Sequence, residues 1–388
     1  MRRNRYDILL PVGLLLACST GIAAGAVRWQ QFPILPGADR QESPDIHGTI
    51  VVWHQFVRQF GDYDVYVADI NNPADPKVLL IGDANDQLNP AIYDHTVAWQ
   101  DYVVVGSYAD WDIRMADLSD WANPQTFAVS NLADNDELSP AVQGDTILWH
   151  SGQAGDHDIS GAAVTDASNP ILFTVTDYHF EQQNAAAYRT TVVWQDNYYG
   201  DWDIYAADIW QKNKPAEFPV SLFQADQTNP AIFGDIVVWQ DNYYGDWDIY
   251  AADISDTENP VEIAVCTNQA SQENPDISDN IIVWQDDRNG NWDIYGFNLT
   301  TDREFQITDN RADQTNPAIA ANTVVWQDKR SGTWNIYAAI LDGAEIAKCT
   351  TSLPADTNND CRIDFTDFAA MASAWLECGL APAQACNP

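Results

Sequence analysis

Basic residues are scarce in this sequence. Its 18 Lys and Arg residues stand against 57 Asp and Glu residues, which gives a formal net charge of −39 at pH 7. A surface this acidic repels nucleic acid and anionic lipid and attracts cations, so we expect no nucleic-acid partner. Catalytic motifs are missing as well, because the chain has no G-x-S-x-G, no H-E-x-x-H and no glycine-rich phosphate loop. These absences favour a non-catalytic protein over an enzyme.

Long apolar runs are missing too, except at the start of the chain. Three arginines precede an apolar run from Ile8 to Ala17, and a small-residue cleavage pattern ends at Ala26. This arrangement predicts a secretory signal peptide over 1–26 and no transmembrane segment after its removal. A rival interpretation makes Cys18, which follows Leu-Leu-Ala, the lipid-anchored residue of a bacterial lipoprotein. Both interpretations predict a bacterial protein that is secreted, periplasmic or at the cell surface.

An internal repeat dominates the rest of the chain. Its clearest copy, Asn229 to Ile254, opens with an Asn-Pro turn and holds three short apolar or aromatic runs separated by Gly-containing turns. The run Val261 to Val265 adds a fourth strand. A tryptophan closes the second strand of every copy at intervals of about 45 residues, the period of a four-stranded propeller blade. The repeat tryptophans are Trp53, Trp99, Trp149, Trp194, Trp239, Trp284 and Trp326.

The third strand of the repeat carries a second marker, as in Asp248-Ile249-Tyr250. These units resemble the TolB-like β-propeller repeat, whose pattern is a Pro-led strand, an apolar strand, a Gly-containing loop and a D-[IL]-Y strand. The resemblance covers nearly all of Val27 to Thr350 and implies an all-β, seven-bladed β-propeller with four-stranded antiparallel blades. Such a ring buries both faces of each blade. Either Trp29 to Leu35 or Ala344 to Lys348 can supply the strand that closes it.

One side of the expected propeller gathers aromatic and acidic loop residues. In an antiparallel blade every second connection emerges on the same side, so the loop between the second and third strands lies beside the connection into the next blade. Tyrosine rings beside carboxylates suit stacking on sugars and hydrogen bonds to hydroxyl groups, although the same residues can serve only to stabilise the loops. The residues of this ligand-binding face are Tyr198, Tyr199, Asp201, Asp226, Tyr243, Tyr244 and Asp246.

Two recurring polar positions are given structural roles. The Asp of the D-I-Y marker, as in Asp203, Asp248 and Asp293, is expected to cap a turn by accepting backbone N–H bonds. A catalytic group is needed once, not in every blade. His54 and His150 occupy the position after the repeat tryptophan that glutamine fills elsewhere, and we expect them to substitute for it in hydrogen bonding.

The last segment changes character. The run Asp356 to Asp367, DTNNDCRIDFTD, spaces oxygen ligands as a calcium loop of the EF-hand type does, and a helix with one apolar face is expected from Phe365 to Leu376. The run departs from an ordinary EF-hand at Cys361, where glycine is usual. It resembles a dockerin repeat, which implies Ca²⁺ as cofactor and a cohesin-like protein as partner; dockerins ordinarily carry two repeats, and one is visible here. The expected calcium ligands are Asp356, Asn358, Asp360, Asp364, Asp367 and the backbone carbonyl of Arg362.

The expected organisation is therefore a signal peptide (1–26), a propeller (27–350), a linker (351–355) and a small α-helical calcium-loop module (356–388). The pairing of the cysteines after Cys18 stays open, although Cys266 and Cys349 hold equivalent places in their repeats. We expect a monomer. One function class is an exported, non-catalytic propeller that binds a carbohydrate or a cell-surface protein and uses its calcium module for attachment or assembly. The other is a polysaccharide-degrading enzyme, a lyase or a glycoside hydrolase, built on the propeller.

Overall fold

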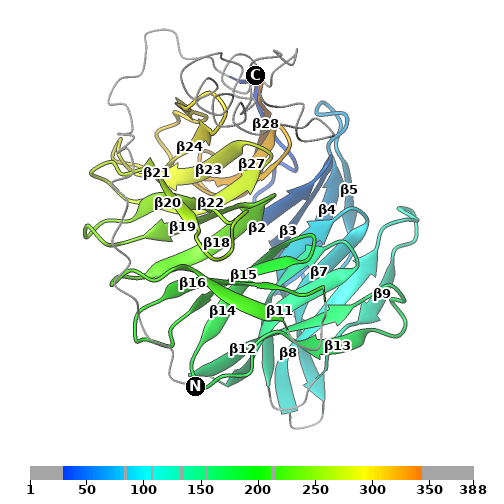
Figure 1. Ribbon diagram of the computed structural model, residues 1–388. Coiled ribbons are helices and arrows are strands. Elements are labelled where there is room, and N and C mark those ends of the chain that lie inside the picture. The colour runs from blue at the N-terminus through cyan, green and yellow to red at the C-terminus, as the bar shows by residue number, and fades with distance from the viewer. Residues whose placement is uncertain are drawn as a thin grey trace, which may run out of the picture.

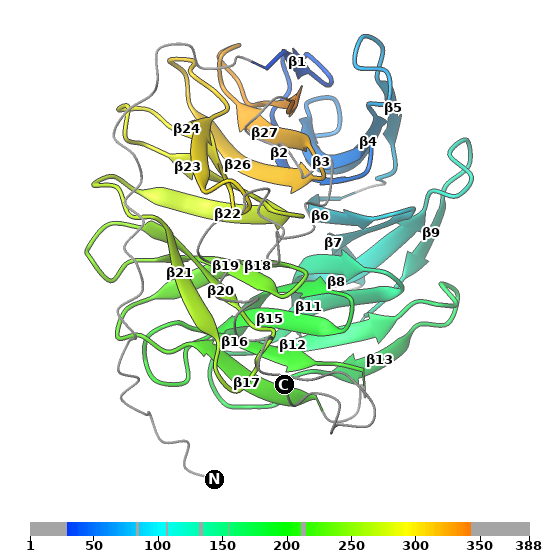
Figure 2. The ribbon, with the colours of Figure 1, turned by 45° about the horizontal axis from the view of Figure 1, so that its top comes forward.

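The protein forms a ring of β-sheets. The computed structural model describes residues 29–342, apart from 83–84, 106–107, 132–134, 154 and 211–214. These residues form 28 strands in seven four-stranded antiparallel sheets (Figures 1 and 2). The predicted seven-bladed, all-β propeller is confirmed. The described residues contain no helix, and so none that could cross a membrane. The expected signal peptide and α-helical calcium module lie outside them.

The four strands of each blade follow one another from the centre of the ring outward (Figure 2). Blade 1 consists of β2 (Gln41–His47), β3 (Ile50–Val57), β4 (Asp62–Asp69) and β5 (Lys77–Leu80). Blade 2 consists of β6 (Gln87–Tyr93), β7 (Thr96–Val105), β8 (Tyr108–Asp117) and β9 (Gln125–Ala128). Blade 3 consists of β10 (Asp136–Gln143), β11 (Thr146–Gln153), β12 (Asp156–Ala163) and β13 (Ile171–Thr174). Blade 4 consists of β14 (Gln182–Tyr188), β15 (Thr191–Asp196), β16 (Asp203–Asp208) and β17 (Ala216–Ser221).

The remaining three blades follow the same plan. Blade 5 consists of β18 (Gln227–Phe233), β19 (Ile236–Asp241), β20 (Asp248–Asp253) and β21 (Val261–Cys266). Blade 6 consists of β22 (Gln272–Ser278), β23 (Ile281–Asp286), β24 (Asp293–Asn298) and β25 (Arg303–Gln306). Blade 7 consists of β26 (Gln314–Ala320), β27 (Thr323–Asp328), β28 (Asn335–Ile340) and β1 (Gln31–Pro33).

The second strand of each blade explains the repeat pattern. β19 reads IVVWQD, and all of it except Ile236 is buried, because each blade is covered on both faces by its neighbours. β-branched residues suit such a strand. Trp239 is 1% exposed, and its ring stacks on Tyr250 of β20, with 6.5 Å between the ring centroids. The repeat tryptophans are therefore the centres of the packing between blades.

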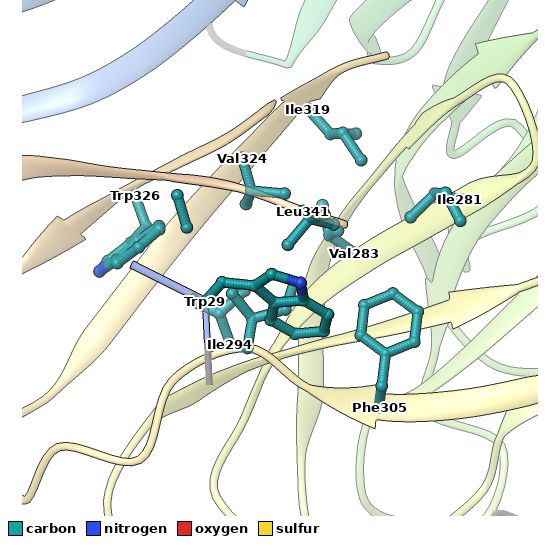
Figure 3. Close-up of a cluster of buried hydrophobic side chains, with 11 residues drawn as sticks. Trp29, Ile281, Val283, Ile294, Phe305, Ile319, Val324, Trp326 and Leu341 are labelled. Atoms are coloured by element: carbon teal, nitrogen blue, oxygen red, sulfur yellow. The ribbon is translucent and has the colours of Figure 1, made fainter. Parts of the chain in front are cut away.

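The first strand of the described chain closes the ring. β1 pairs with β28, so that Gln31 lies opposite Ala339, and Figure 2 shows the blue β1 beside the orange last blade. Trp29, just before β1, enters the core between blades 6 and 7 and packs edge-on against Phe305 at 5.4 Å (Figure 3). Its indole nitrogen donates to the carbonyl of Asp342 at 2.8 Å. Of the two candidate closing strands, the segment from Trp29 to Leu35 pairs with blade 7, and the segment from Ala344 to Lys348 lies outside the described residues.

A polar belt joins the innermost strands. In every inner strand one Asn or Ser has a φ between 50° and 53°, at a bulge in the pairing with the second strand. The side-chain oxygen of Gln240 accepts from the Asn229 amide of its own blade (3.2 Å) and from the backbone N–H of Asn274 in the next blade (2.8 Å). His54 Nδ1 accepts from the Asn89 N–H in the same way (3.2 Å), which confirms that this histidine replaces glutamine in hydrogen bonding. The belt comprises Ser43, Asn89, Ser139, Asn184, Asn229, Asn274, Asn316, His54, Gln100, Gln195, Gln240, Gln285 and Gln327. The expectation for His150 was wrong, because its Nδ1 is buried and makes no hydrogen bond within the described residues.

Candidate functional site

The tyrosines of the ligand-binding face lie in the loops between the second and third strands of blades 4 and 5. Tyr198, Tyr243 and Tyr244 are 37%, 55% and 67% exposed, and Tyr199 is half-buried. Within each loop the two rings pack edge to face with centroids 5.0 Å apart. Tyr198 also contacts Phe180 at 5.5 Å, so aromatic surface extends toward blade 3.

Aspartates hold these loops in place. Asp196 and Asp241, the last residues of β15 and β19, accept the backbone N–H groups of Tyr198 and Tyr243 at 2.8 Å. Asp226 accepts from the Trp202 N–H at 3.1 Å, which ties the loop of blade 4 to the start of blade 5. Asp86, Asp136 and Asp313 accept equivalent bonds in other blades. Of the predicted acidic residues of this face, Asp226 therefore braces the loop, and Asp201 and Asp246 are half-buried beside it.

The turn-capping aspartate is not the one expected in blades 5 and 6. The cap is the last residue of the second strand, whereas the D-I-Y aspartate lies directly opposite it, as Asp286 lies opposite Asp293. Asp293 accepts from amide side chains, among them Asn289 at 2.9 Å, rather than from backbone N–H groups. The prediction for Asp248 and Asp293 was wrong, because two aspartates in register are equivalent in the sequence pattern and differ only in which one faces the loop backbone.

In the last two blades an arginine binds the turn-capping aspartate. Arg288 Nε donates to Asp286 at 2.8 Å and its Nη1 donates to Glu304 at 2.7 Å, while the guanidinium lies 4.2 Å from the centroid of the Tyr295 ring. The salt bridges outweigh burial and raise the pKa of Arg288. Arg330 of blade 7 donates to Asp328 in the same manner and lies 4.4 Å from the ring centroid of Tyr337. These contacts are internal to the protein.

Blade 5 has the acids without the arginine. Its acidic cluster consists of Asp241, Asp248 and Glu262 beside the Tyr250 ring. Burial raises the pKa of Asp241, and it raises the pKa of Glu262 to about 7. Burial, followed by repulsion from Asp246 and Asp241, raises the pKa of Asp248 to about 7. The pKa of Tyr250 is also raised, by burial and then by Asp248. The cluster therefore places three acidic side chains together beside the tyrosine loops.

The innermost strands carry two aspartates where five blades have alanine. Asp45 accepts from the N–H groups of Ile46 and Ile92, both at 2.8 Å, and so bridges blades 1 and 2. Asp276 accepts from Ile277 at 2.8 Å and from Ile319 at 2.7 Å, bridging blades 6 and 7. Burial raises the pKa of Asp45 to about 6 and that of Asp276 to about 7. Their roles are structural, since both oxygens of each carboxylate bind backbone.

A histidine–glutamate pair at the junction of blades 3 and 4 was missed by sequence reasoning. His157 Nδ1 lies 2.6 Å from Glu181 Oε2, and the His150 ring packs edge-on against the His157 ring at 5.4 Å. Burial, then His157, lowers the pKa of His150 to about 4, so this ring is neutral at pH 7. Burial opposes ionisation of Glu181, but hydrogen bonds from His157 and other donors lower its pKa overall. The available signal was the histidine in a third-strand position that other blades fill with Trp or Tyr.

The predicted calcium ligands, Asp356 to Asp367, lie outside the described residues. Among the residues the structure does describe, no group of three or more His, Cys, Asp or Glu side chains could hold a metal ion. Cys266 at the end of β21 is buried and disulfide-bonded. The other cysteines whose pairing the sequence leaves open, Cys349, Cys361, Cys378 and Cys386, lie outside the described part of the chain.

Comparison with known proteins supports the fold alone. No protein-family model matches the chain, and no curated protein matches it. The propeller domain of the Trilobed protease from Pyrococcus furiosus is similar, with a TM-score of 0.57, 12% identity and coverage of 81% of this chain and 99% of that one. The oligogalacturonate lyase of Vibrio parahaemolyticus matches with a TM-score of 0.58, 10% identity and coverage of 82% and 99%. TolB from Acinetobacter baumannii matches at 0.47 and 12% identity over 66% of this chain and 62% of TolB.

These matches agree with the strand topology. The chain is a seven-bladed β-propeller whose blades are four-stranded and antiparallel. Proteases and a lyase share this fold, and so the fold by itself does not separate a binding protein from an enzyme.

Proposed function

We propose that this chain is an exported, non-catalytic propeller that binds a carbohydrate on its ligand-binding face. The observation that carries the proposal is the pair of tyrosine loops on neighbouring blades. Tyr243 and Tyr244 are more than half exposed, and within the described residues their hydroxyl groups make no hydrogen bond. Aromatic rings with free polar tips, held on loops fixed by Asp196 and Asp241, provide stacking surface and hydrogen-bonding groups for sugars.

Glycan retention tests the proposal. A variant with Tyr198, Tyr199, Tyr243 and Tyr244 all replaced by Ala is compared with the wild type on a glycan array and in gels that contain polysaccharide. We expect retention to be lost and the melting temperature to stay nearly constant, since three of the four tyrosines are exposed. A matched control replaces two exposed apolar residues of β13, Ile171 and Leu172, by Ala. Equal retention by the tyrosine variant would rule out this face, and selective capture of a protein would point to a cell-surface protein as the ligand.

We further propose that the C-terminal segment is a calcium-binding, dockerin-like module for attachment or assembly. Its support is the sequence spacing of oxygen ligands from Asp356 to Asp367. Titration of Ca²⁺ into the whole protein should give one saturable site in calorimetry, and the double substitution Asp356→Ala with Asp360→Ala should remove it. A control with Asp256→Ala and Glu258→Ala, in an exposed propeller loop, should retain it. Identical heats for both double variants would show that the segment is not the site.

A polysaccharide-degrading enzyme is the second candidate, and the contact between His157 and Glu181 favours it. A histidine held by a carboxylate has the composition of a general base. Because one matched structure is an oligogalacturonate lyase, oligogalacturonate is the first substrate to test. Release of new ends by the wild type but not by His157→Ala would establish the enzyme, and no release from any glycan that the protein retains would support the binding function.

A further inference from the structure

In blade 6 an arginine is held by two acids and a tyrosine ring. The Arg288 guanidinium spans Asp286 on β23 and Glu304 on β25 and covers the ring of Tyr295. The side chains of Asp286 and Glu304 are 0% and 9% exposed, so the two acids depend on this cation. Blade 7 repeats the arrangement, since Arg330 donates to Asp328 and to Gln31. Two neighbouring blades thus hold a guanidinium at the same position.

Blade 5 has the same acids and tyrosine around that position but no arginine in it. The strand registers make Asp241 equivalent to Asp286, Tyr250 to Tyr295 and Glu262 to Glu304. Tyr243 stands where blade 6 has Arg288. Its ring is 55% exposed and lies 6.2 Å from Phe223 in the adjoining connection, so it does not replace the guanidinium.

The remaining donors of blade 6 are missing from blade 5 as well. Asp293 accepts hydrogen bonds from Asn289, Asn291 and Gln306. The equivalent positions in blade 5 are, in the same order, Tyr244, Asp246 and Ala264. Asp248, the equivalent of Asp293, is 2% exposed and has no hydrogen-bond partner among the described residues. A carboxylate that is buried without a donor is costly, which points to a donor from outside the chain.

Blade 4, a duplicate of the same sequence, gives its equivalent of Glu262 a hydrogen-bond donor. Residues 192–209 repeat as 237–254. In blade 4 the hydroxyl of Tyr178 donates to Glu217, the equivalent of Glu262, at 2.6 Å. The residue equivalent to Tyr178 in blade 5 is Phe223, which has no hydroxyl to donate.

We propose that the acidic cluster of blade 5 (Asp241, Asp248 and Glu262 beside the Tyr250 ring) binds the guanidinium of an arginine side chain supplied by a partner polypeptide. A planar guanidinium bridges separated carboxylates and stacks on an aromatic ring, as Arg288 does in blade 6. A metal ion needs ligands that converge, and no such group of acids occurs among the described residues. The net charge of −39 attracts a basic partner from a distance. This site goes beyond the proposed carbohydrate function and uses different side chains.

The test uses the whole protein and a short peptide, acetyl-Gly-Arg-Gly-amide, with its citrulline analogue as a neutral probe of the same shape. At low ionic strength we expect the arginine peptide to bind with a dissociation constant of about 1 mM or below, as a single anchored side chain can provide. The citrulline peptide should not bind detectably. Glu262→Gln should weaken binding about fivefold or more while leaving glycan retention unchanged, so the two proposals can fail separately.

Two added arginines provide the sharpest comparison. Tyr243→Arg restores the arrangement of blade 6, so the new side chain should occupy the site, abolish peptide binding and raise the melting temperature. Thr257→Arg adds the same charge to an exposed loop at the other end of blade 5 and should leave peptide binding within about threefold of the wild type, because distant surface charges are largely screened. Equal binding of the two peptides, or undiminished binding to a folded Tyr243→Arg variant, would overturn the proposal.

Discussion

Replacing Asp276 by Asn should change how the stability of the protein depends on pH. In the folded chain the pKa of this carboxyl is raised to about 7, by burial and by the nearby Asp45. In the unfolded chain it is about 3.9. A carboxyl with a raised folded pKa contributes its full stability at low pH and loses it as the pH rises through the window between the two values, here about 4 to 7. The wild type should therefore be destabilised by this group between pH 5 and pH 8.

The magnitude follows from the slope of 1.36 kcal/mol per pH unit for one proton. Integrated from pH 5 to pH 8, the loss is about 2.6 kcal/mol, and we take about 1–3 kcal/mol because the side chain is half-buried and partly screened by water. For about 300 ordered residues the unfolding entropy is about 0.6 kcal/mol per kelvin, so the shift is about 2–4 °C. The amide oxygen of the variant can accept only one of the two N–H groups that Asp276 binds. The variant should therefore also lose about 1–3 kcal/mol of folding stability at every pH.

Scanning calorimetry of both proteins at pH 5, 6, 7 and 8 measures the effect. The difference in melting temperature between wild type and Asp276→Asn should move by about 2–4 °C in favour of the variant from pH 5 to pH 8. Asp256→Asn, in an exposed turn of blade 5, is the control for removing one negative charge. A difference that is constant with pH, or one that Asp256→Asn reproduces, would refute the argument from the raised pKa.

Four further substitutions test the packing of the ring by urea or thermal unfolding. Arg288→Met leaves two buried acids without their cation and should cost about 3–5 kcal/mol, or about 5–8 °C, whereas Arg330→Met should cost less because Arg330 bridges only one acid and a neutral glutamine. Asn229→Ala should cost about 1–3 kcal/mol, since it places alanine at a φ of 53° and removes three hydrogen bonds of the polar belt. Trp29→Ala should cost about 3–5 kcal/mol by leaving a cavity beside Phe305. Equal losses for the two arginine variants, or changes below about 0.5 kcal/mol for the others, would contradict these assignments.

The sequence was sufficient for the architecture because the repeat is local. Each tryptophan, such as Trp239, closes a strand whose partners lie within the same unit, so spacing alone predicts blade number and strand order. Ring closure is not local. Either terminal segment is apolar enough to pair, and only the three-dimensional arrangement decides that Gln31 lies opposite Ala339.

Some features of the candidate sites can be predicted from the sequence, and others depend on how the strands are arranged in the fold. The exposure of Tyr243 and Tyr244 follows from their place in a polar loop, which the sequence displays. The contact of Arg288 with Glu304 spans three strands of a folded blade, so the sequence does not predict it. That blade 5 lacks the equivalent arginine can be recognised only when the strand registers align the two blades. His157 can be recognised in the sequence, because it occupies a position that Trp or Tyr fills in the other repeats.

The pairing of β1 with β28 has a consequence for how the molecule comes to be folded. These strands lie about 300 residues apart, so bringing them together costs roughly 5 kcal/mol of chain entropy before any contact is gained. A chain delivered from its N-terminus presents its first strand long before the strand that receives it exists. Until β28 has formed, β1 is a short strand with unpaired backbone groups that can pair with another chain. We therefore expect completion of the last blade to be the slowest step of folding.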